Sequence, residues 1–200
     1  MGIEIRRLTP EMAEDYVRFF DETPHNVNTG GGKCYCVTWR SDDSYTGNGD
    51  HWFPTPEERR ARALGFVGSG SLQGYLAYDG GRAVGWCNAN GSCKLCLQYL
   101  ASFWPIAREP DSIRVKSVFC FVIAPDWQRR GIATRLLQRV CQDAAREGYD
   151  FVEAYVDTNT ESEDFRGYLE MYEKCGFRLY AQREGRAVVR RALKQLPDRR

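Results

Sequence analysis

The segment from Val118 to Cys141 constrains the fold more than any other part of the chain. It begins with a continuous apolar run, Val118–Ile123, which is typical of a buried strand, and then meets a helix breaker at Pro125. Beyond the breaker, apolar residues recur at helical spacing, at Leu136, Leu137, Val140 and Cys141. The segment therefore predicts a strand, a tight turn and an amphipathic helix.

The turn that joins this strand to this helix suits a bound anion. The first N–H groups of a helix have no partner within it, and the positive end of the helix dipole attracts a pyrophosphate. Gly131 and Ala133 keep the approach free of bulky side chains. There is no G-x-G-x-x-G and no Gly-Lys-Ser/Thr here, so neither the dinucleotide fingerprint nor the nucleoside triphosphate loop is satisfied. The remaining pattern is Q-x-x-G-x-A, at Gln128 to Ala133.

With this pattern, the chain resembles the GNAT superfamily of acetyl-CoA-dependent N-acyltransferases, whose pyrophosphate loop reads Q/R-x-x-G-x-G/A. A second signature of that superfamily, Y-x-K-x-G-F, resembles Tyr172–Phe177. The likeness covers most of the chain, best from Gly74 onward, and extends to a poorly characterised bacterial branch that also carries Cys-aromatic-Cys near its N-terminus. The alternative is that both signatures are ordinary helix caps, with Gly176 as the residue after a helix.

The resemblance implies a single mixed α/β domain over residues 1–200. It has a central sheet, mostly antiparallel with one parallel, splayed pair, flanked by helices, and a long substrate-side loop at about residues 23–53. The implied reaction is direct transfer of acetyl from acetyl-CoA to a primary amine of a small molecule in a ternary complex. Three alternatives stay open: a non-catalytic acetyl-CoA-binding regulatory module, a protein or peptide amine acetyltransferase, and a thiol-rich metal-binding or redox protein.

The resemblance also implies how the co-substrate acetyl-CoA is held. Backbone groups of Phe121 and Ile123 pair with the pantetheine arm as an added strand would, and N–H groups of the turn hold the pyrophosphate. Arg129 and Arg130 add charge or are merely solvated. The residues expected to bind acetyl-CoA are Phe121, Val122, Ile123, Gln128, Arg129, Arg130, Gly131, Ile132, Ala133 and Thr134.

Tyr172 matches the superfamily tyrosine and is the candidate general acid, because a phenol with a pKa of about 10 can protonate a thiolate leaving group. The alternative is an aromatic core residue. Ser117 stands where many relatives carry a glutamate base, and Phe165 replaces an asparagine. Glu153 is the candidate base, with Asp157 or a chain of waters as substitutes, although an exposed carboxylate is the simpler interpretation of each acidic residue.

Aromatic side chains of the long loop, Tyr35, Trp39, Tyr45 and Trp52, favour a small amine with apolar surface. Tyr35, Trp39 and Trp86 are the candidate substrate contacts. His25 and His51 lie in loop segments and receive no role.

Eight cysteines leave two interpretations open. Cys34, Cys36, Cys93 and Cys96 form C-x-C and C-x-x-C pairs that could supply four thiolates to a tetrahedral zinc. We favour thiols and no metal, because neither a flanking glycine knuckle nor a matching second repeat is present. The other four, Cys87, Cys120, Cys141 and Cys175, fit apolar core positions.

Composition excludes several classes of partner. The net charge is +1, from 28 basic and 27 acidic residues, so there is no bulk electrostatic case for nucleic acid or an anionic membrane. No apolar run is long enough to span a bilayer, and the first residues lack a signal-peptide core. We expect a cytoplasmic protein that does not bind membranes. Whether it forms a homodimer is left open.

Local signals predict the remaining elements. Alternation predicts a first strand, a Thr-Pro pair and a capping box each predict a helix start, and Gly-rich turns predict hairpins. The expected elements are strand 2–8, a helix from Thr9–Pro10, a helix from Thr55 to Gly68, a hairpin 74–88, an ambiguous stretch 89–111, a strand from Ile113, a helix to Glu147, strand 151–156, a helix to Lys174, and two strands around Glu184 and Gly185.

Overall fold

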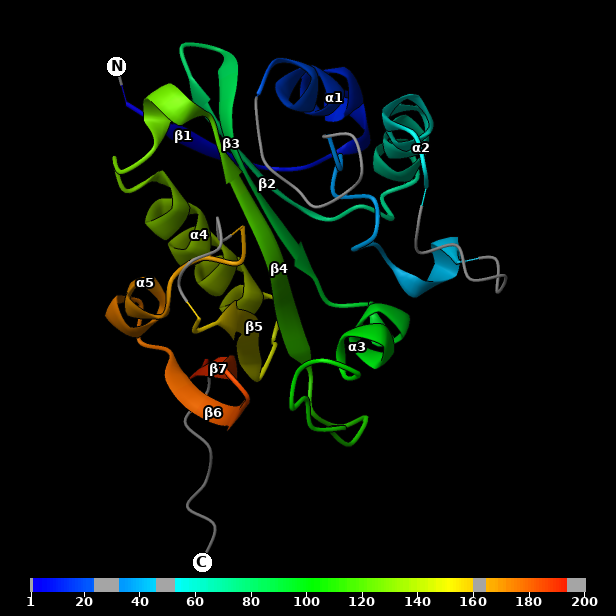
Figure 1. The fold of residues 1–200 in the computed structure, drawn as a ribbon. Coiled ribbons are helices and arrows are strands. Elements are labelled where there is room, and N and C mark those ends of the chain that lie inside the picture. The colour runs from blue at the N-terminus through cyan, green and yellow to red at the C-terminus, as the bar shows by residue number, and fades with distance from the viewer. Residues whose placement is uncertain (1, 24–32, 46–52, 160–164, 194–200) are drawn as a thin grey trace, which may run out of the picture.

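One seven-stranded sheet organises the computed structural model, which describes residues 2–23, 33–45, 53–159 and 165–193 (Figure 1). The strand order is β1-β2-β3-β4-β5-β7-β6, and all neighbours are antiparallel except the parallel pair β4 and β5. The predicted mixed sheet with one parallel pair is confirmed. The strands are β1 (Glu4–Arg7), β2 (Gly74–Asp79), β3 (Arg82–Asn90), β4 (Val115–Ile123), β5 (Phe151–Asp157), β6 (Arg178–Arg183) and β7 (Arg186–Ala192).

Helices cover both faces of the sheet, with a separate apolar core under each (Figure 1). One core lies under α1 (Ala13–Glu22), α2 (Pro56–Gly68) and α3 (Lys94–Leu100); we call this side the α1–α3 face. The other lies under α4 (Ile132–Arg146) and α5 (Leu169–Lys174), and is called the α4–α5 face. Three short 3-10 helices complete the description: η1 (Pro10–Met12), η2 (Asp42–Ser44) and η3 (Pro125–Trp127).

The predicted helix starts behave differently from one another. At α2, the Thr55 hydroxyl accepts the Glu58 N–H at 3.1 Å, as a capping box requires. Thr9 makes no such bond, and the turn after it is the 3-10 helix η1, so α1 begins only at Ala13. The ambiguous stretch contains α3, whose first N–H groups are capped from outside the stretch by the Asp42 carboxylate.

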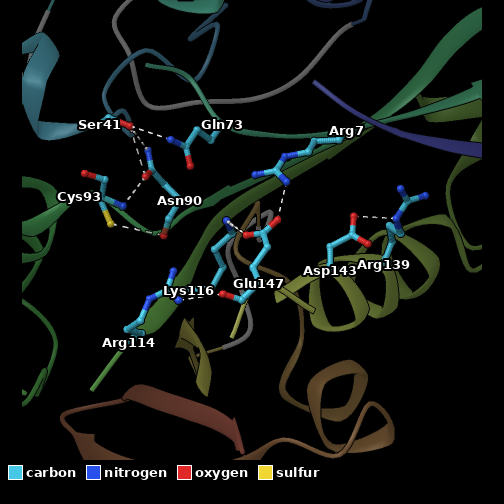
Figure 2. Close-up of polar contacts among 11 residues, drawn as sticks. Arg7, Ser41, Gln73, Asn90, Cys93, Arg114, Lys116, Arg139, Asp143 and Glu147 are labelled. Carbon is cyan, nitrogen blue, oxygen red and sulfur yellow. Dashed lines mark hydrogen bonds and ion pairs between the residues drawn. The ribbon is translucent and has the colours of Figure 1, made fainter. Parts of the chain in front are cut away.

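Polar side chains join distant parts of the chain (Figure 2). The Glu147 carboxylate, just after α4, accepts hydrogen bonds from Arg7 in β1 and from Lys116 in β4, the latter at 3.2 Å. Ser41 accepts the side-chain amides of Gln73 and Asn90, at 3.1 and 3.2 Å. The part of the predicted long loop that lies within residues 33–45 is therefore fixed against the sheet.

No helix among the described residues is long and apolar enough to cross a membrane.

Candidate functional site

The edge of β4 that faces β5 has a strand partner only along the first half of the strand. The two strands pair only from Val115 to Val118, and in the described chain no strand pairs with β4 on that side beyond this point. On the other side, Asn88 of β3 pairs with Cys120 and Ala89 with Val118, which leaves Phe119 as the extra residue of a bulge. Bulges redirect backbone and side chains, and an edge of this kind accepts an added strand. The predicted splay of the parallel pair is confirmed.

The end of β4 leads into an uncapped helix N-terminus. Through η3 and Gln128, the chain reaches Gly131, the N-cap residue of the 15-residue helix α4, and no side chain caps that terminus. Gly131 has φ +77°, a conformation that favours glycine, and a Cβ there would meet no atom within 4 Å. The strand, turn and helix predicted from sequence are all present, and no side chain caps the N–H groups at the first turn of α4.

Side chains around this turn divide into an anchor and an exposed rim. Ile132 is buried in the core of the α4–α5 face and holds the helix start against the sheet. Arg129 and Arg130 are exposed, and the Arg130 guanidinium lies 5.0 Å from the centre of the Trp127 ring. Since Phe121 and Val122 are buried as well, the turn and the strand present mainly backbone groups to a ligand.

Tyr172 lies next to the β4 edge. Tyr172 belongs to α5, and its ring is fully buried. The ring centre lies 5.2 Å from that of Phe177 and 6.4 Å from that of Phe121. The Tyr172 hydroxyl donates a hydrogen bond of 2.7 Å to the carbonyl of Arg166. Phe121 and Tyr172 were both predicted to belong to the site, and the structure places them next to each other.

The segment Phe165–Gly167 runs along this edge and contacts both groups. The Phe121 N–H donates to the carbonyl of Phe165, and the next carbonyl, that of Arg166, accepts from Tyr172. Gly167 has φ +81°, a conformation that favours glycine, and a Cβ there would lie 2.7 Å from the flexible end of Met171 and 3.3 Å from the Tyr172 ring. Two consecutive carbonyls thus occupy the backbone donor of β4 and the hydroxyl of Tyr172.

Glu153 is buried rather than exposed, which corrects the simpler interpretation of this carboxylate. Only 1% of the residue is exposed. Arg190 of β7 and Tyr155 of β5 donate hydrogen bonds to its two oxygens. Burial raises the pKa of Glu153 above its usual range, and the adjacent Arg190 guanidinium opposes that rise. Asp157, at the end of β5, is partly exposed and accepts the N–H of Asn159.

The candidate substrate aromatics do not share one environment. Trp39 stacks on Phe119, the bulge residue of β4, with ring centres 4.9 Å apart and planes within 3°. Tyr35 is buried and donates to Asp21, while Trp86 has no exposed surface and packs edge-on against Tyr16. Of the three, Trp39 stacks on the bulge residue, and Trp86 lies in the core. Trp52, His25 and His51 lie outside the described residues.

Sequence reasoning missed the residues that surround Trp39. The Arg166 guanidinium lies 4.3 Å from the centre of the Trp104 ring and 5.5 Å from that of Trp39. Trp104 lies in the stretch 89–111, for which no element was predicted, and Arg166 follows Phe165, the residue that replaces the asparagine of relatives. No local pattern marks either one; the abundance of aromatic residues between Tyr99 and Trp104 was the available signal.

The cysteines meet different partners. The sulfur of Cys36 lies 2.8 Å from that of Cys120, and the sulfur of Cys96 lies 2.9 Å from the Tyr45 hydroxyl. Cys93 contacts the Asn90 carbonyl at 3.6 Å (Figure 2). Burial raises the pKa of the Cys36 and Cys93 thiols. Across the described ranges, no three His, Cys, Asp or Glu side chains are arranged to hold a metal ion.

We predict that protein purified without a metal-affinity tag contains no stoichiometric zinc. The free energy of zinc binding would otherwise contribute to folding, so a chelator would lower the melting temperature by many degrees. Elemental analysis and melting curves with and without a chelator measure both quantities. One zinc per chain together with a chelator-dependent melting temperature would contradict the prediction.

Comparison with known proteins places this geometry among characterised folds. A family model described as the acetyltransferase (GNAT) family matches residues 34–177. Similar solved structures include a GNAT-family acetyltransferase from Streptococcus pneumoniae (18% identity, 96% of this chain and 99% of that one, TM-score 0.54). Another is a PaiA N-acetyltransferase from Thermoplasma acidophilum in complex with coenzyme A (15%, 96% and 99%, 0.55). A third is a GCN5-related N-acetyltransferase from Kribbella flavida (21%, 95% and 97%, 0.55). None of the curated proteins matches the sequence.

Proposed function

Because the chain belongs to the acetyltransferase (GNAT) family, we propose that it transfers the acetyl group of acetyl-CoA directly to a primary amine of a small molecule. One observation carries the proposal: the edge of β4 beyond Val118 runs into the uncapped first turn of α4, and Tyr172 lies beside that edge. In this proposal the β4 edge pairs with the pantetheine arm, the first turn of α4 binds the pyrophosphate, and Tyr172 protonates the thiolate leaving group.

Acetyl-CoA is held mainly by backbone groups in this proposal. The pantetheine amides pair with Phe121 and Ile123 in the manner of an added strand. The pyrophosphate lies at the start of α4, where the N–H groups from Gln128 to Thr134 and the helix dipole favour negative charge. The exposed guanidinium groups of Arg129 and Arg130 add positive charge at the rim.

The chemical step needs an oxyanion donor and an acid. A backbone N–H near the bulge of β4 points at the thioester oxygen and stabilises the negative charge that develops there. The Tyr172 hydroxyl then protonates the coenzyme A thiolate as the C–S bond breaks. Its buried position keeps bulk water away from the leaving group.

Acetyl-CoA competes with the segment Phe165–Gly167. The carbonyl of Phe165 occupies the Phe121 N–H that the pantetheine arm is proposed to use, and Arg166 occupies the Tyr172 hydroxyl. The segment therefore has to leave these positions before or during binding.

We predict that binding of acetyl-CoA is rate-limited by this release. The observed rate constant, followed by tryptophan fluorescence after rapid mixing, should level off as the acetyl-CoA concentration rises, because Trp104 lies under Arg166 and reports the displacement. A rate constant that increases linearly to the highest concentration would contradict a preceding release step.

The proposed acceptor is a small amine with apolar surface, because Trp39 and Phe119 stack at the bulge and Trp104 lies close by. Purified protein with acetyl-CoA and a panel of small amines and lysine or N-terminal peptides tests this, with release of the coenzyme A thiol as the readout. Turnover restricted to peptides would favour the peptide acetyltransferase, and binding without any turnover would favour the regulatory module.

A further inference from the structure

Three buried side chains form a continuous chain of hydrogen bonds on the α1–α3 face of the sheet. The hydroxyls of Ser117 and Tyr155 lie 2.9 Å apart, and the Tyr155 hydroxyl donates to the Glu153 carboxylate at 2.7 Å. Ser117 and Glu153 are also register partners across the parallel pair β4 and β5. Each of the three residues is at most 1% exposed, so the chain runs entirely inside the protein.

The direction of the hydrogen bonds is fixed by the carboxylate. Because Glu153 in its charged form only accepts, the Tyr155 proton points toward it. The Tyr155 oxygen is then free to accept, so the Ser117 proton points toward Tyr155. The Ser117 side chain also hydrogen-bonds with the Cys93 thiol, so an acceptor amine has to reach the Ser117 oxygen beside that thiol. In this arrangement a proton received at Ser117 would move toward Glu153.

The chain starts beside the bulge of β4. The Tyr155 ring stacks on Phe119 with ring centres 5.6 Å apart, and Trp39 stacks on the same phenyl ring. Tyr172 lies in the core of the opposite face. An acid and a proton acceptor are thus placed on opposite sides of the sheet, with the β4 edge beyond Val118 between them.

The charged and titratable groups around Glu153 leave it able to take up a proton. Arg190 of β7 pairs with Glu153 but also with Glu109, at 2.7 Å, so its charge is shared between two carboxylates. Cys93, at the start of α3, faces Ser117 and Tyr155. Burial raises the pKa of the Glu153 carboxyl and also that of the Tyr155 hydroxyl.

We propose that Ser117, Tyr155 and Glu153 form the proton path that accepts the proton of the acceptor amine. As the amine nitrogen bonds to the thioester carbon and the C–S bond breaks, the nitrogen loses one proton to the Ser117 oxygen, directly or through one water. The Ser117 proton moves to Tyr155, and the Tyr155 proton moves to Glu153, which becomes neutral. Tyr172 supplies the proton of the thiol, and exchange with solvent resets both ends after the products leave.

This inference rests on the proposed function and adds residues to it. Ser117 is the catalytic residue of the path, and Tyr155 and Glu153 act through it. The proposal requires that displacement of Phe165–Gly167, whose Arg166 side chain lies over Trp39 and Trp104, opens a path to the buried Ser117 hydroxyl.

Tyr155→Phe is the sharpest test, since it keeps the ring on Phe119 and removes only the hydroxyl. With the best amine of the panel, we expect kcat/KM to fall by about 10²-fold, the scale of general base catalysis. Wild-type kcat/KM should rise with pH through the raised pKa of Glu153, and the variant should lose that rise. Ser117→Ala and the double variant should lose the same factor, because the residues act as one unit.

Tyr78→Phe is the matched control. Tyr78 is also a buried tyrosine of the sheet that donates to a carboxylate, that of Asp15 at 3.1 Å, but it lies in β2. This variant should keep the wild-type pH profile. Glu153→Gln adds a third break in the path, with coenzyme A affinity and melting temperature measured for every variant.

The outcomes separate the two proposals. Wild-type protein that releases no thiol with any amine contradicts the proposed function. Active wild-type protein with an unchanged pH profile in Tyr155→Phe, or with additive losses in the double variant, overturns the proton path and leaves the proposed function standing.

Discussion

Replacing Gly131 with tryptophan is expected to abolish acetyl-CoA binding in calorimetry while leaving the circular dichroism spectrum unchanged. The Cβ of Gly131 would point into open space in front of the first turn of α4, where the pyrophosphate is proposed to lie. An indole there covers the N–H groups that a phosphate needs. The positive φ adds strain of about 1–2 kcal/mol, which a folded domain tolerates.

Gly81→Trp controls for that strain. Gly81 also has a positive φ, +91°, and also faces open space, but it lies in the turn between β2 and β3. This variant should carry a similar destabilisation and bind acetyl-CoA normally.

Ala133→Asp separates folding from binding at the same site. A carboxylate in the first turn of a helix stabilises it by about 0.3–1 kcal/mol, but the same charge repels a pyrophosphate. We therefore expect weaker acetyl-CoA binding, and the melting temperature is measured beside it because Ala133 also packs against the core of the α4–α5 face. Wild-type affinity in both Gly131→Trp and Ala133→Asp would remove the pyrophosphate from this turn.

Tyr172→Phe is expected to lower turnover by about 10²-fold or more, the scale of general acid catalysis. The ring still packs against Phe177, but the coenzyme A thiolate loses its proton donor. Affinity for coenzyme A should stay close to that of the wild type, so the loss appears in kcat and not in binding.

Removing this hydroxyl also removes its hydrogen bond of 2.7 Å to the carbonyl of Arg166, at a cost of about 0.5–1.5 kcal/mol in stability. Activity is therefore compared well below the melting temperature of each variant. Full turnover in Tyr172→Phe would mean that the ring only packs.

The parts of the fold that were predicted correctly depend on neighbours in the sequence. The run Val118–Ile123, the turn at Gly131 and the apolar stripe of α4 all form within one short segment, so local pattern sufficed. The same holds for the capping box at Thr55.

The parts that were missed depend on residues far away in the chain. The N-terminus of α3 is capped by Asp42, which precedes it by more than fifty residues, so its own stretch carries no start signal. The burial of Glu153 could not be predicted from its own strand, because its partner Arg190 belongs to β7, much later in the chain. The bulge at Phe119 arises from the pairing with β3, which a single strand does not reveal.

The short pairing between β4 and β5 also has a mechanical consequence. Only four register pairs, Val115 to Val118 with Phe151 to Ala154, join the half-sheet β1–β4 to the half-sheet of β5, β7 and β6. This seam and the β1–β2 pair have four register pairs each, fewer than any other strand pair of the described sheet, so the seam is the weakest backbone junction between two multi-strand parts of the sheet. A pantetheine arm paired with β4 would add backbone hydrogen bonds beside this seam and would stabilise the folded sheet for as long as it is bound. At 100 times its dissociation constant, such a ligand adds about 2.7 kcal/mol to the free energy of unfolding.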